Sequence, residues 1–278
     1  MSSNLLAASC RKAEKAIMGH MNHLERDKST SISFHPVIVT HISMLRLANW
    51  ERVHHMFDLI QEGDIGPGLI ARTMVYVIAN GETDLEKLSS LTDRGRNQVI
   101  ELARSRVATG IQVIYSALDD ISKETANILS AEFNVEIKEK DCFHDIKLGK
   151  KNPNVQFLAK TLPDLWNDIE FIPDRGESLM IARRRLAECI GRLIGRHRGN
   201  SIAVVLSTTM SLLFYTLVVG GDPNIDDWLE TGHASCSAYE YAKDGWTLVM
   251  PPDNSFLIDG NTVRDALPDE VKDALGIR

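Results

Sequence analysis

The chain has 278 residues and a formal net charge of −7, and 44% of its residues are hydrophobic and 25% charged. This composition is ordinary for a globular protein with a packed core. The negative charge argues against a nucleic-acid or anionic-membrane partner. Charged residues interrupt the apolar residues near the N-terminus, and the run Leu212–Val219 is too short to span a bilayer. We therefore expect a cytoplasmic protein without a signal peptide.

Two apolar helical segments are predicted in the first part of the chain. Apolar residues recur at three- and four-residue spacing from Leu6 to Leu24, and a second apolar segment extends from Val39 to Ile60. Residues 1–72 are therefore interpreted as a helical extension that is too small for a robust core of its own. We expect it to contact a protein partner or to mediate self-association. Its histidines lack acidic or cysteine partners at a matched spacing, so we expect no metal site.

From Met74 the pattern changes to alternating strands and helices. The predicted strands are Met74–Ile78, Gln112–Tyr115, Val135–Ile137 and Ile202–Leu206, with Ala234–Tyr241 and Trp246–Met250 as a closing antiparallel pair. The first predicted helix has Thr92 or Asp93 as its N-cap and extends through Ala103. The other predicted helices are Ser122–Phe133, Glu177–Ile194 and Met210–Val219. This alternation predicts an α/β domain over residues 73–278, a three-layer sandwich with a mainly parallel central sheet.

Polar segments follow three of the predicted strands directly. They are Ala79–Thr83, Ser116–Ile121 and Ser207–Thr209. Because ligands bind beyond the carboxyl ends of the strands in sheets of this kind, we expect these segments to converge on one crevice.

The four cysteines are far apart in the sequence, at positions 10, 142, 189 and 236. None of them forms a CxxC pair, so the spacing indicates neither a zinc site nor a disulfide framework. We expect buried free thiols in a reducing compartment.

Several segments resemble the histidine phosphatase superfamily, which has the phosphoglycerate mutase-like fold. The first strand of that family ends in Arg-His-Gly-Glu-Thr, and Met74–Thr83 is similar to it except at two positions. Further segments appear in the order that the family has: Leu91–Gln98, Tyr115–Ala117, Gly176–Ser178, Val204–Thr208 and Ala234–Val249. The resemblance implies a phosphoglycerate mutase-like domain from about Met74 to about Leu257.

The resemblance also implies that the catalytic residues of the family are missing. In that family one histidine attacks phosphorus, a second histidine and two arginines hold the phosphoryl oxygens, and an acid protonates the leaving group. Ala79 and Ile121 stand at the arginine positions, and Asn80 and Ser207 stand at the histidine positions. Asp145 matches the acid. A carboxamide is a poor nucleophile, so the resemblance implies a domain that has lost this chemistry.

Each candidate residue also has a purely structural interpretation. Asn80 could be a turn residue beside Gly81, Ser207 could cap the following helix, and His144 could be an ordinary loop histidine. Our first hypothesis is a pseudoenzyme that acts as a binding, scaffolding or regulatory module. The alternatives are an enzyme of the same fold that is rebuilt for a non-phosphate ligand, or residual phosphatase or mutase activity. No cofactor is expected. The candidate ligand-binding residues are Asn80, Gly81, Glu82, Ser116, His144, Asp145, Ser207 and Thr208.

Overall fold

The computed structural model describes residues 72–83, 90–150 and 153–277. The predicted helical extension therefore lies outside the described residues, apart from Arg72. The described strands are β1 (Thr73–Ala79), β2 (Ile111–Ser116), β3 (Glu136–Glu139), β4 (Ser201–Leu206), β5 (Cys236–Ala242) and β6 (Gly245–Asp253). The helices are α3 (Asp93–Ser105), α4 (Asp120–Phe133), η1 (Asp141–Phe143), α5 (Val155–Asn167), α6 (Leu179–Ile194), α7 (Thr208–Val219), α8 (Ile225–Leu229), α9 (Val263–Ala266) and α10 (Asp269–Ala274).

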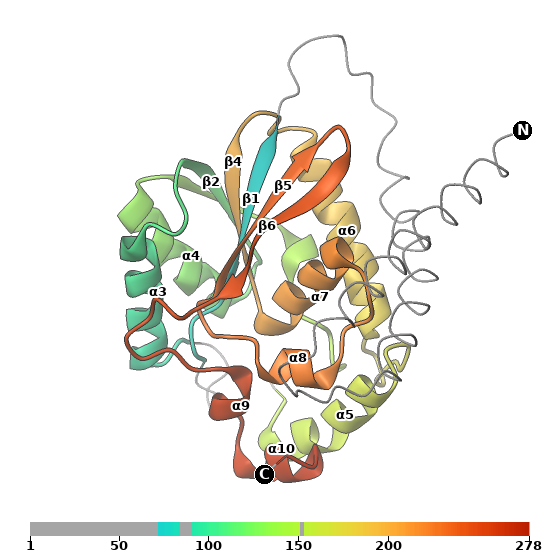
Figure 1. Cartoon of the computed structure of the whole chain (residues 1–278). Coiled ribbons are helices and arrows are strands. Elements are labelled where there is room, and N and C mark those ends of the chain that lie inside the picture. The colour runs from blue at the N-terminus through green and yellow to red at the C-terminus, as the bar shows by residue number, and fades with distance from the viewer. Residues whose placement is uncertain (1–71, 84–89, 151–152, 278) are drawn as a thin grey trace, which may run out of the picture. The chain divides into compact units, whose positions relative to one another are not determined.

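The six strands form one sheet in the order β3-β2-β4-β1-β5-β6 (Figure 1). Strand β1 pairs in parallel with β4, and β2 pairs in parallel with both β4 and β3. Strand β5 runs antiparallel to β1 and to β6. The prediction of a mainly parallel sheet with a closing antiparallel pair is therefore confirmed.

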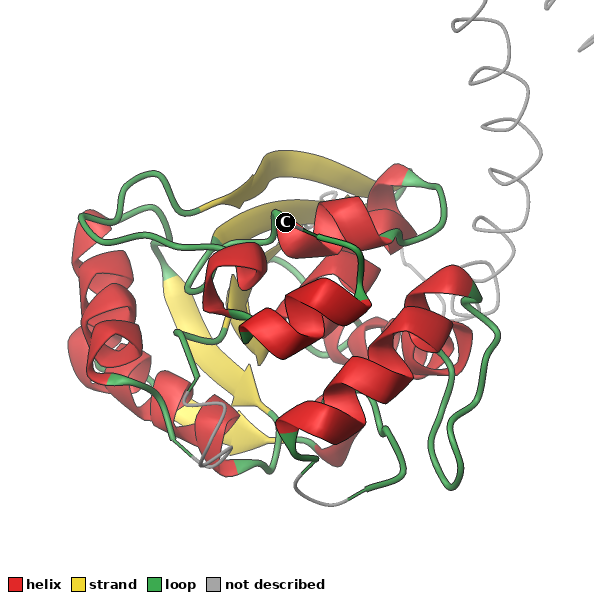
Figure 2. Cartoon of the chain, turned by 90° about the horizontal axis from the view of Figure 1, so that it is seen from below, coloured by secondary structure: helices red, strands yellow, loops and turns green. Residues whose placement is uncertain are grey.

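Helices cover both faces of the sheet, which makes the three layers that the sequence predicts (Figures 1 and 2). Successive side chains of a strand point to opposite faces, so Val75 and Val77 pack in one apolar cluster and Ile78 packs in the other. The first cluster includes Leu186 from α6, and the second includes Leu102 from α3. Because the central strands are buried on both faces, their sequences are continuous apolar runs.

Four helices that the sequence analysis did not predict lie beyond one end of the sheet (Figure 1). Helix α5 has 13 residues and contains Pro163, whereas α8, α9 and α10 are only 5, 4 and 6 residues long. Segments as short as these last three carry too few apolar positions for a periodic pattern to be recognised. None of the helices described over residues 72–83, 90–150 and 153–277 is long and apolar enough to cross a membrane.

Two of the cysteines form a disulfide bond, so the expectation of free thiols was wrong for them. Cys142 in η1 is bonded to Cys189 in α6, 47 residues away along the chain. No short spacing motif signals such a pair, because the fold alone brings the two residues together. Cys236 is buried and free, and Cys10 lies outside the described residues.

Candidate functional site

A cavity of about 610 Å³ lies where the parallel strands end. Asn80 follows β1 directly, Ser207 follows β4 directly, and Asp119 follows β2 after two residues; all three line the cavity. The helices beyond the sheet supply apolar walls, which include Leu158, Leu162, Trp228 and Val263. Strand ends therefore carry polar groups to the cavity, and α5, α8 and α9 enclose it.

Asn80 is buried at the base of the cavity, with 7% of its surface exposed. Its backbone amide donates to Leu206 O at 2.8 Å, which fixes the turn after β1 against β4. Its side-chain Nδ2 donates to Ser122 Oγ at 3.2 Å. Its Oδ1 is buried and has no hydrogen-bond partner among the described residues. A buried acceptor without a partner costs roughly 1–3 kcal/mol, so such an atom in a cavity wall is suited to meeting a ligand.

His233 lines the same cavity, although the sequence analysis did not propose it. Burial lowers its pKa to about 4, against the opposing effects of the Glu82 charge and of a hydrogen bond to the Asn80 backbone. The ring is therefore neutral at neutral pH. Its Nε2 is buried without a partner among the residues that the structure describes. In a neutral imidazole, Nε2 accepts a hydrogen bond when Nδ1 carries the proton.

The position of His233 follows from the antiparallel strand. Strand β5 begins at the edge where β1 ends, because Ile78 lies opposite Cys236. Ala234 N donates to Asn80 O at 2.9 Å and so holds the residue before it beside the turn after β1. The predicted site was confined to the carboxyl ends of the parallel strands, so it did not include a residue at the amino end of this antiparallel strand.

Ser207 and Asp145 form a second polar pair in the cavity. Ser207 Oγ donates to Asp145 Oδ1 at 2.5 Å and accepts from Met210 N at 3.1 Å, so the interpretation of Ser207 as a helix cap is confirmed. Desolvation raises the pKa of Asp145, and hydrogen bonds from Ser207 and from Ile146 N oppose it. Asp145 is exposed at the surface of the cavity, which moderates the effect of desolvation.

Hydrogen bonds to an ion pair, Arg185 on α6 and Glu177 just before it, hold the loop that carries Asp145. Arg185 Nη2 lies 2.6 Å from Glu177 Oε1, and Arg185 Nη1 donates to Cys142 O at 2.8 Å and to His144 O at 2.9 Å. Glu177 Oε1 also accepts from Lys147 N at 3.1 Å. Together with the disulfide bond, these contacts hold the backbone on both sides of Asp145.

Three cations line the exposed part of the cavity, and the sequence analysis missed them. They are Lys147 and Lys150, on the loop after Asp145, and Arg175. The two loops lie against each other, because a Cβ at Gly149 would lie 1.7 Å from Asp174 O. The exposed rim therefore carries these cations together with the carboxyl groups of Asp119 and Asp145, whereas Asn80 and His233 at the buried base are uncharged.

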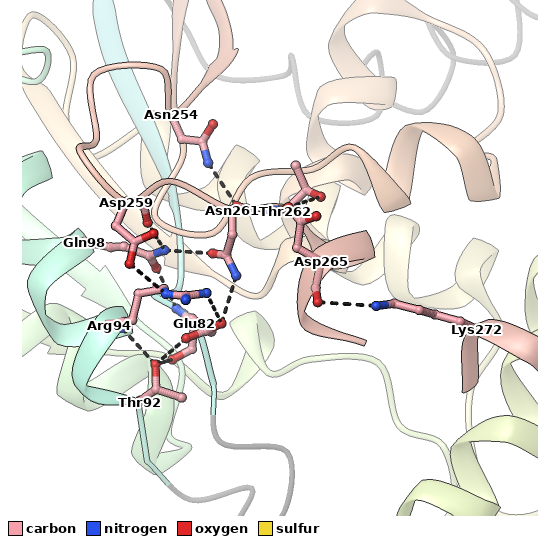
Figure 3. Close-up of polar contacts among 11 residues, drawn as sticks. Glu82, Thr92, Arg94, Gln98, Asn254, Asp259, Asn261, Thr262, Asp265 and Lys272 are labelled. Atoms are coloured by element: carbon pink, nitrogen blue, oxygen red, sulfur yellow. Dashed lines mark hydrogen bonds and ion pairs between the residues drawn. The ribbon is translucent and has the colours of Figure 1, made fainter. Parts of the chain in front are cut away.

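Glu82 belongs to a network beside the cavity and does not line it (Figure 3). Its carboxylate accepts from Thr92 Oγ1 at 2.6 Å, from Arg94 Nη1 at 3.2 Å and from Asn261 Nδ2 at 2.8 Å. Gln98 Nε2 donates to Asn261 Oδ1 at 2.7 Å. The network joins the turn after β1, the start of α3 and the segment around Asn261.

The same network supports His233, because Asn261 O accepts from His233 N at 3.0 Å. Glu82 therefore acts on the cavity through Asn261, which orients the turn that carries the histidine.

The structure brings four of the eight candidate ligand-binding residues together around the cavity: Asn80, Asp145, Ser207 and Thr208. Gly81 instead lies between β1 and α3, where a Cβ would approach Gly95 O to 2.4 Å. Ser116 is buried and donates to Ala117 O at 3.1 Å. The ring of His144 lies against Asp145 O and Glu177. A ligand contact by these residues stays a prediction.

The structure also locates the two positions at which the resemblance places the arginines of the family. Ile121 lines the cavity, and Ala79 is fully buried in β1. Over residues 72–83, 90–150 and 153–277, no cluster of three or more His, Cys, Asp or Glu side chains could hold a metal ion.

Comparison with known proteins connects this architecture to one superfamily. The profile of the Histidine phosphatase superfamily (branch 1) matches residues 76–254. No curated protein matches the sequence significantly. At the identities that follow, the likeness to solved structures shows the fold alone.

Three solved structures are similar over nearly their whole length. Phosphoglycerate mutase from Bacillus anthracis str. Sterne has 13% identity and a TM-score of 0.52, with 67% of this chain and 96% of that chain covered. Mycobacterial glucosyl-3-phosphoglycerate phosphatase complexed with VO3 has 16% identity and a TM-score of 0.55, with 64% and 98% covered. A histidine-to-alanine mutant of phosphoserine phosphatase from Entamoeba histolytica, in complex with phosphoserine, has 16% identity and a TM-score of 0.54, with 67% and 100% covered.

Proposed function

Because this chain belongs to the histidine phosphatase superfamily, we propose that it is a pseudophosphatase that binds a small organic molecule in the cavity beyond the sheet. The observation that carries the proposal is an open cavity of about 610 Å³ with Asn80 at its base. Ligand pockets have volumes of roughly 300–1,000 Å³ and combine apolar walls with a few polar groups. A cavity that had only lost its function would be free to fill with side chains.

The groups at the resemblance positions do not support phosphoryl transfer. The amide of Asn80 is not a nucleophile, and the hydroxyl of Ser207 is engaged with Asp145 and with the start of α7. No arginine stands at position 79 or 121 to meet charge on a transferring phosphoryl group. A binding role therefore fits these residues better than turnover.

A similar structure supports binding without a complete set of histidines. The histidine-to-alanine mutant of phosphoserine phosphatase was solved in complex with phosphoserine. A protein of this fold can therefore hold a ligand after one histidine is replaced.

The test is whether a small molecule accompanies the native protein. We expect mass spectrometry of the denatured, natively purified chain to detect a stoichiometric small molecule. The variant Ile121→Trp fills the cavity with a larger side chain and should lack that molecule, whereas Asp244→Asn, in the β5–β6 turn, should keep it. An identical profile for Ile121→Trp and the native chain would contradict the proposal.

A rebuilt enzyme is the second candidate, and one observation favours it. The cavity contains His233, a neutral histidine whose Nε2 is buried without a partner among the described residues, and Asp145, a carboxyl group whose pKa is raised. A base and an acid in one cavity are the elements of proton transfer. Turnover of any co-purified molecule that His233→Gln abolishes would favour this candidate over simple binding.

We further propose that residues 1–72 contact a protein partner or a second copy of the chain. Their apolar periodicity supports this, because an amphipathic helix must cover its apolar face. The molar mass of the full chain by light scattering should fall when Ile17→Asp and Leu24→Asp are introduced. The sequence pattern is our basis for proposing a cytoplasmic location. The Cys142–Cys189 disulfide bond weighs against this proposal, because such bonds are rare in the cytosol.

A further inference from the structure

Two buried atoms at the base of the cavity are hydrogen-bond acceptors without partners among the described residues. They are Asn80 Oδ1 and His233 Nε2. The amide nitrogen of Asn80 is used on Ser122 Oγ, which leaves the oxygen unpaired. The ring of His233 is neutral, and Nε2 accepts in the tautomer that carries the proton on Nδ1. A ligand that satisfies both atoms must offer hydrogen-bond donors.

The neighbouring carboxyl groups have the same polarity. Asp145 and Asp119 line the cavity with acceptor oxygens. The hydroxyl proton of Ser207 already points to Asp145, and Ser122 N already donates to Asp119 Oδ1 at 2.8 Å. Carboxylates near two neutral acceptors favour a donor that carries positive charge.

The remaining cavity surface indicates the other parts of the ligand. Apolar side chains also line the cavity, among them Leu158, Leu162 and Trp228. Lys147 and Arg175 are exposed cations of the lining. The lining therefore combines buried acceptors, apolar side chains and exposed cations.

We propose that the cavity binds an organic amine that carries an acidic group at its far end. The amine donates to Asn80 Oδ1 and His233 Nε2, the apolar body lies along the walls, and the acid faces Lys147 and Arg175. This inference rests on the proposed function, since it names the ligand class of the same cavity.

A matched set of aromatic probes tests the inference by calorimetric titration of the full chain at pH 7. The probes are 4-(aminomethyl)benzoate, 4-methylbenzoate without the amine, benzylamine without the acid, and benzyl phosphate. We expect 4-(aminomethyl)benzoate to bind at least about tenfold more tightly than 4-methylbenzoate, because only the former satisfies the buried acceptors. Benzylamine should be intermediate, and benzyl phosphate should bind most weakly.

Variants at the base should remove the preference for the amine. In Asn80→Leu and His233→Phe, the affinity ratio of 4-(aminomethyl)benzoate to 4-methylbenzoate should fall toward one. Asn80→Asp keeps the shape of the side chain and adds charge, so it should increase the ratio. His197→Gln is the control, because His197 lies by the amino end of β1, where Thr73 Oγ1 donates to His197 O at 3.1 Å. Its ratio should equal that of the native chain.

Equal or tighter binding of 4-methylbenzoate or benzyl phosphate would overturn the amine inference. So would the absence of heat from 4-(aminomethyl)benzoate at millimolar concentration, or an unchanged ratio in folded Asn80→Asp and His233→Phe. Preference for benzyl phosphate would still be consistent with a binding role for the cavity. That role is contradicted only if Ile121→Trp and the native chain carry the same small molecules.

Discussion

Ser207 Oγ lies 2.5 Å from Asp145 Oδ1 while it caps the helix that follows it. One hydroxyl thus connects the end of β4 to a loop 62 residues away in the sequence. The proton goes to Asp145, and the lone pairs accept from Met210 N. The N-cap of α7 and the carboxyl group of Asp145 in the cavity are therefore linked through one side chain.

Ser207→Ala should reduce stability by about 1 kcal/mol, because loss of an N-cap typically costs about that much. The loss of the hydrogen bond to Asp145 should add to it. Ser178→Ala is the matched control, since Ser178 caps α6 through Ile181 N. Urea unfolding of both variants measures the difference, and a smaller loss for Ser207→Ala than for Ser178→Ala would show that the contact with Asp145 contributes nothing.

Asp145→Asn should increase stability at neutral pH. Desolvation raises the pKa of Asp145 in the folded chain, so the ionised carboxyl group destabilises the fold. This destabilisation is absent below the unfolded pKa and is complete once the pH has risen through the folded pKa. The stability gain of Asp145→Asn over the native chain should therefore shrink on acidification toward pH 4. Urea unfolding at a series of pH values checks this, and a gain that grows on acidification would contradict the direction of the pKa shift.

His233 should make the fold sensitive to acid. Its folded pKa of about 4 lies below the ordinary histidine value of 6.5. The stability that neutral His233 contributes is therefore complete above the unfolded pKa and is lost as the pH falls toward the folded pKa. Over this interval the loss amounts to about 3 kcal/mol, at about 1.4 kcal/mol for each pH unit.

The variant His233→Asn keeps a hydrogen-bonding side chain but does not titrate. Its free energy of unfolding should therefore fall less between pH 7 and pH 4 than that of the native chain. Parallel pH profiles for the two proteins would mean that His233 is not held neutral by burial.

Removal of the disulfide bond should destabilise the domain by about 2–4 kcal/mol, because the bond lowers the conformational entropy of the unfolded chain. The variant with both Cys142→Ser and Cys189→Ser tests this by urea unfolding. Cys236→Ser controls for the loss of a thiol, although burial makes that thiol poorly reactive by raising its pKa to about 12. Equal stability of the double variant and the native chain under oxidising conditions would show that the bond contributes nothing.

The layers of the fold follow from local patterns in the sequence. Strands such as β1 and β4 are continuous apolar runs because both faces are buried, and caps such as Thr92 mark helix starts with a side chain that accepts from Gly95 N. The short helices α8, α9 and α10 escaped detection because their positions depend on contacts with distant residues rather than on a periodic pattern.

The candidate site could be predicted only in part. The turns after β1 and β4 were found because a parallel sheet brings its strand ends together. His233 and the rim cations reach the cavity from an antiparallel strand and from long loops, whose course no local pattern specifies. The pairing of Cys142 with Cys189 could not be predicted either, because no local pattern brings these two residues together.

The most direct test of the central claim is steady-state hydrolysis of p-nitrophenyl phosphate by the full chain, with His233→Gln and Asn80→Ala measured in parallel. The account predicts that the native chain and both variants release p-nitrophenol no faster than the buffer does. Release by the native chain that His233→Gln abolishes would contradict it, since His233 would then serve as a nucleophile or a base in phosphoryl transfer.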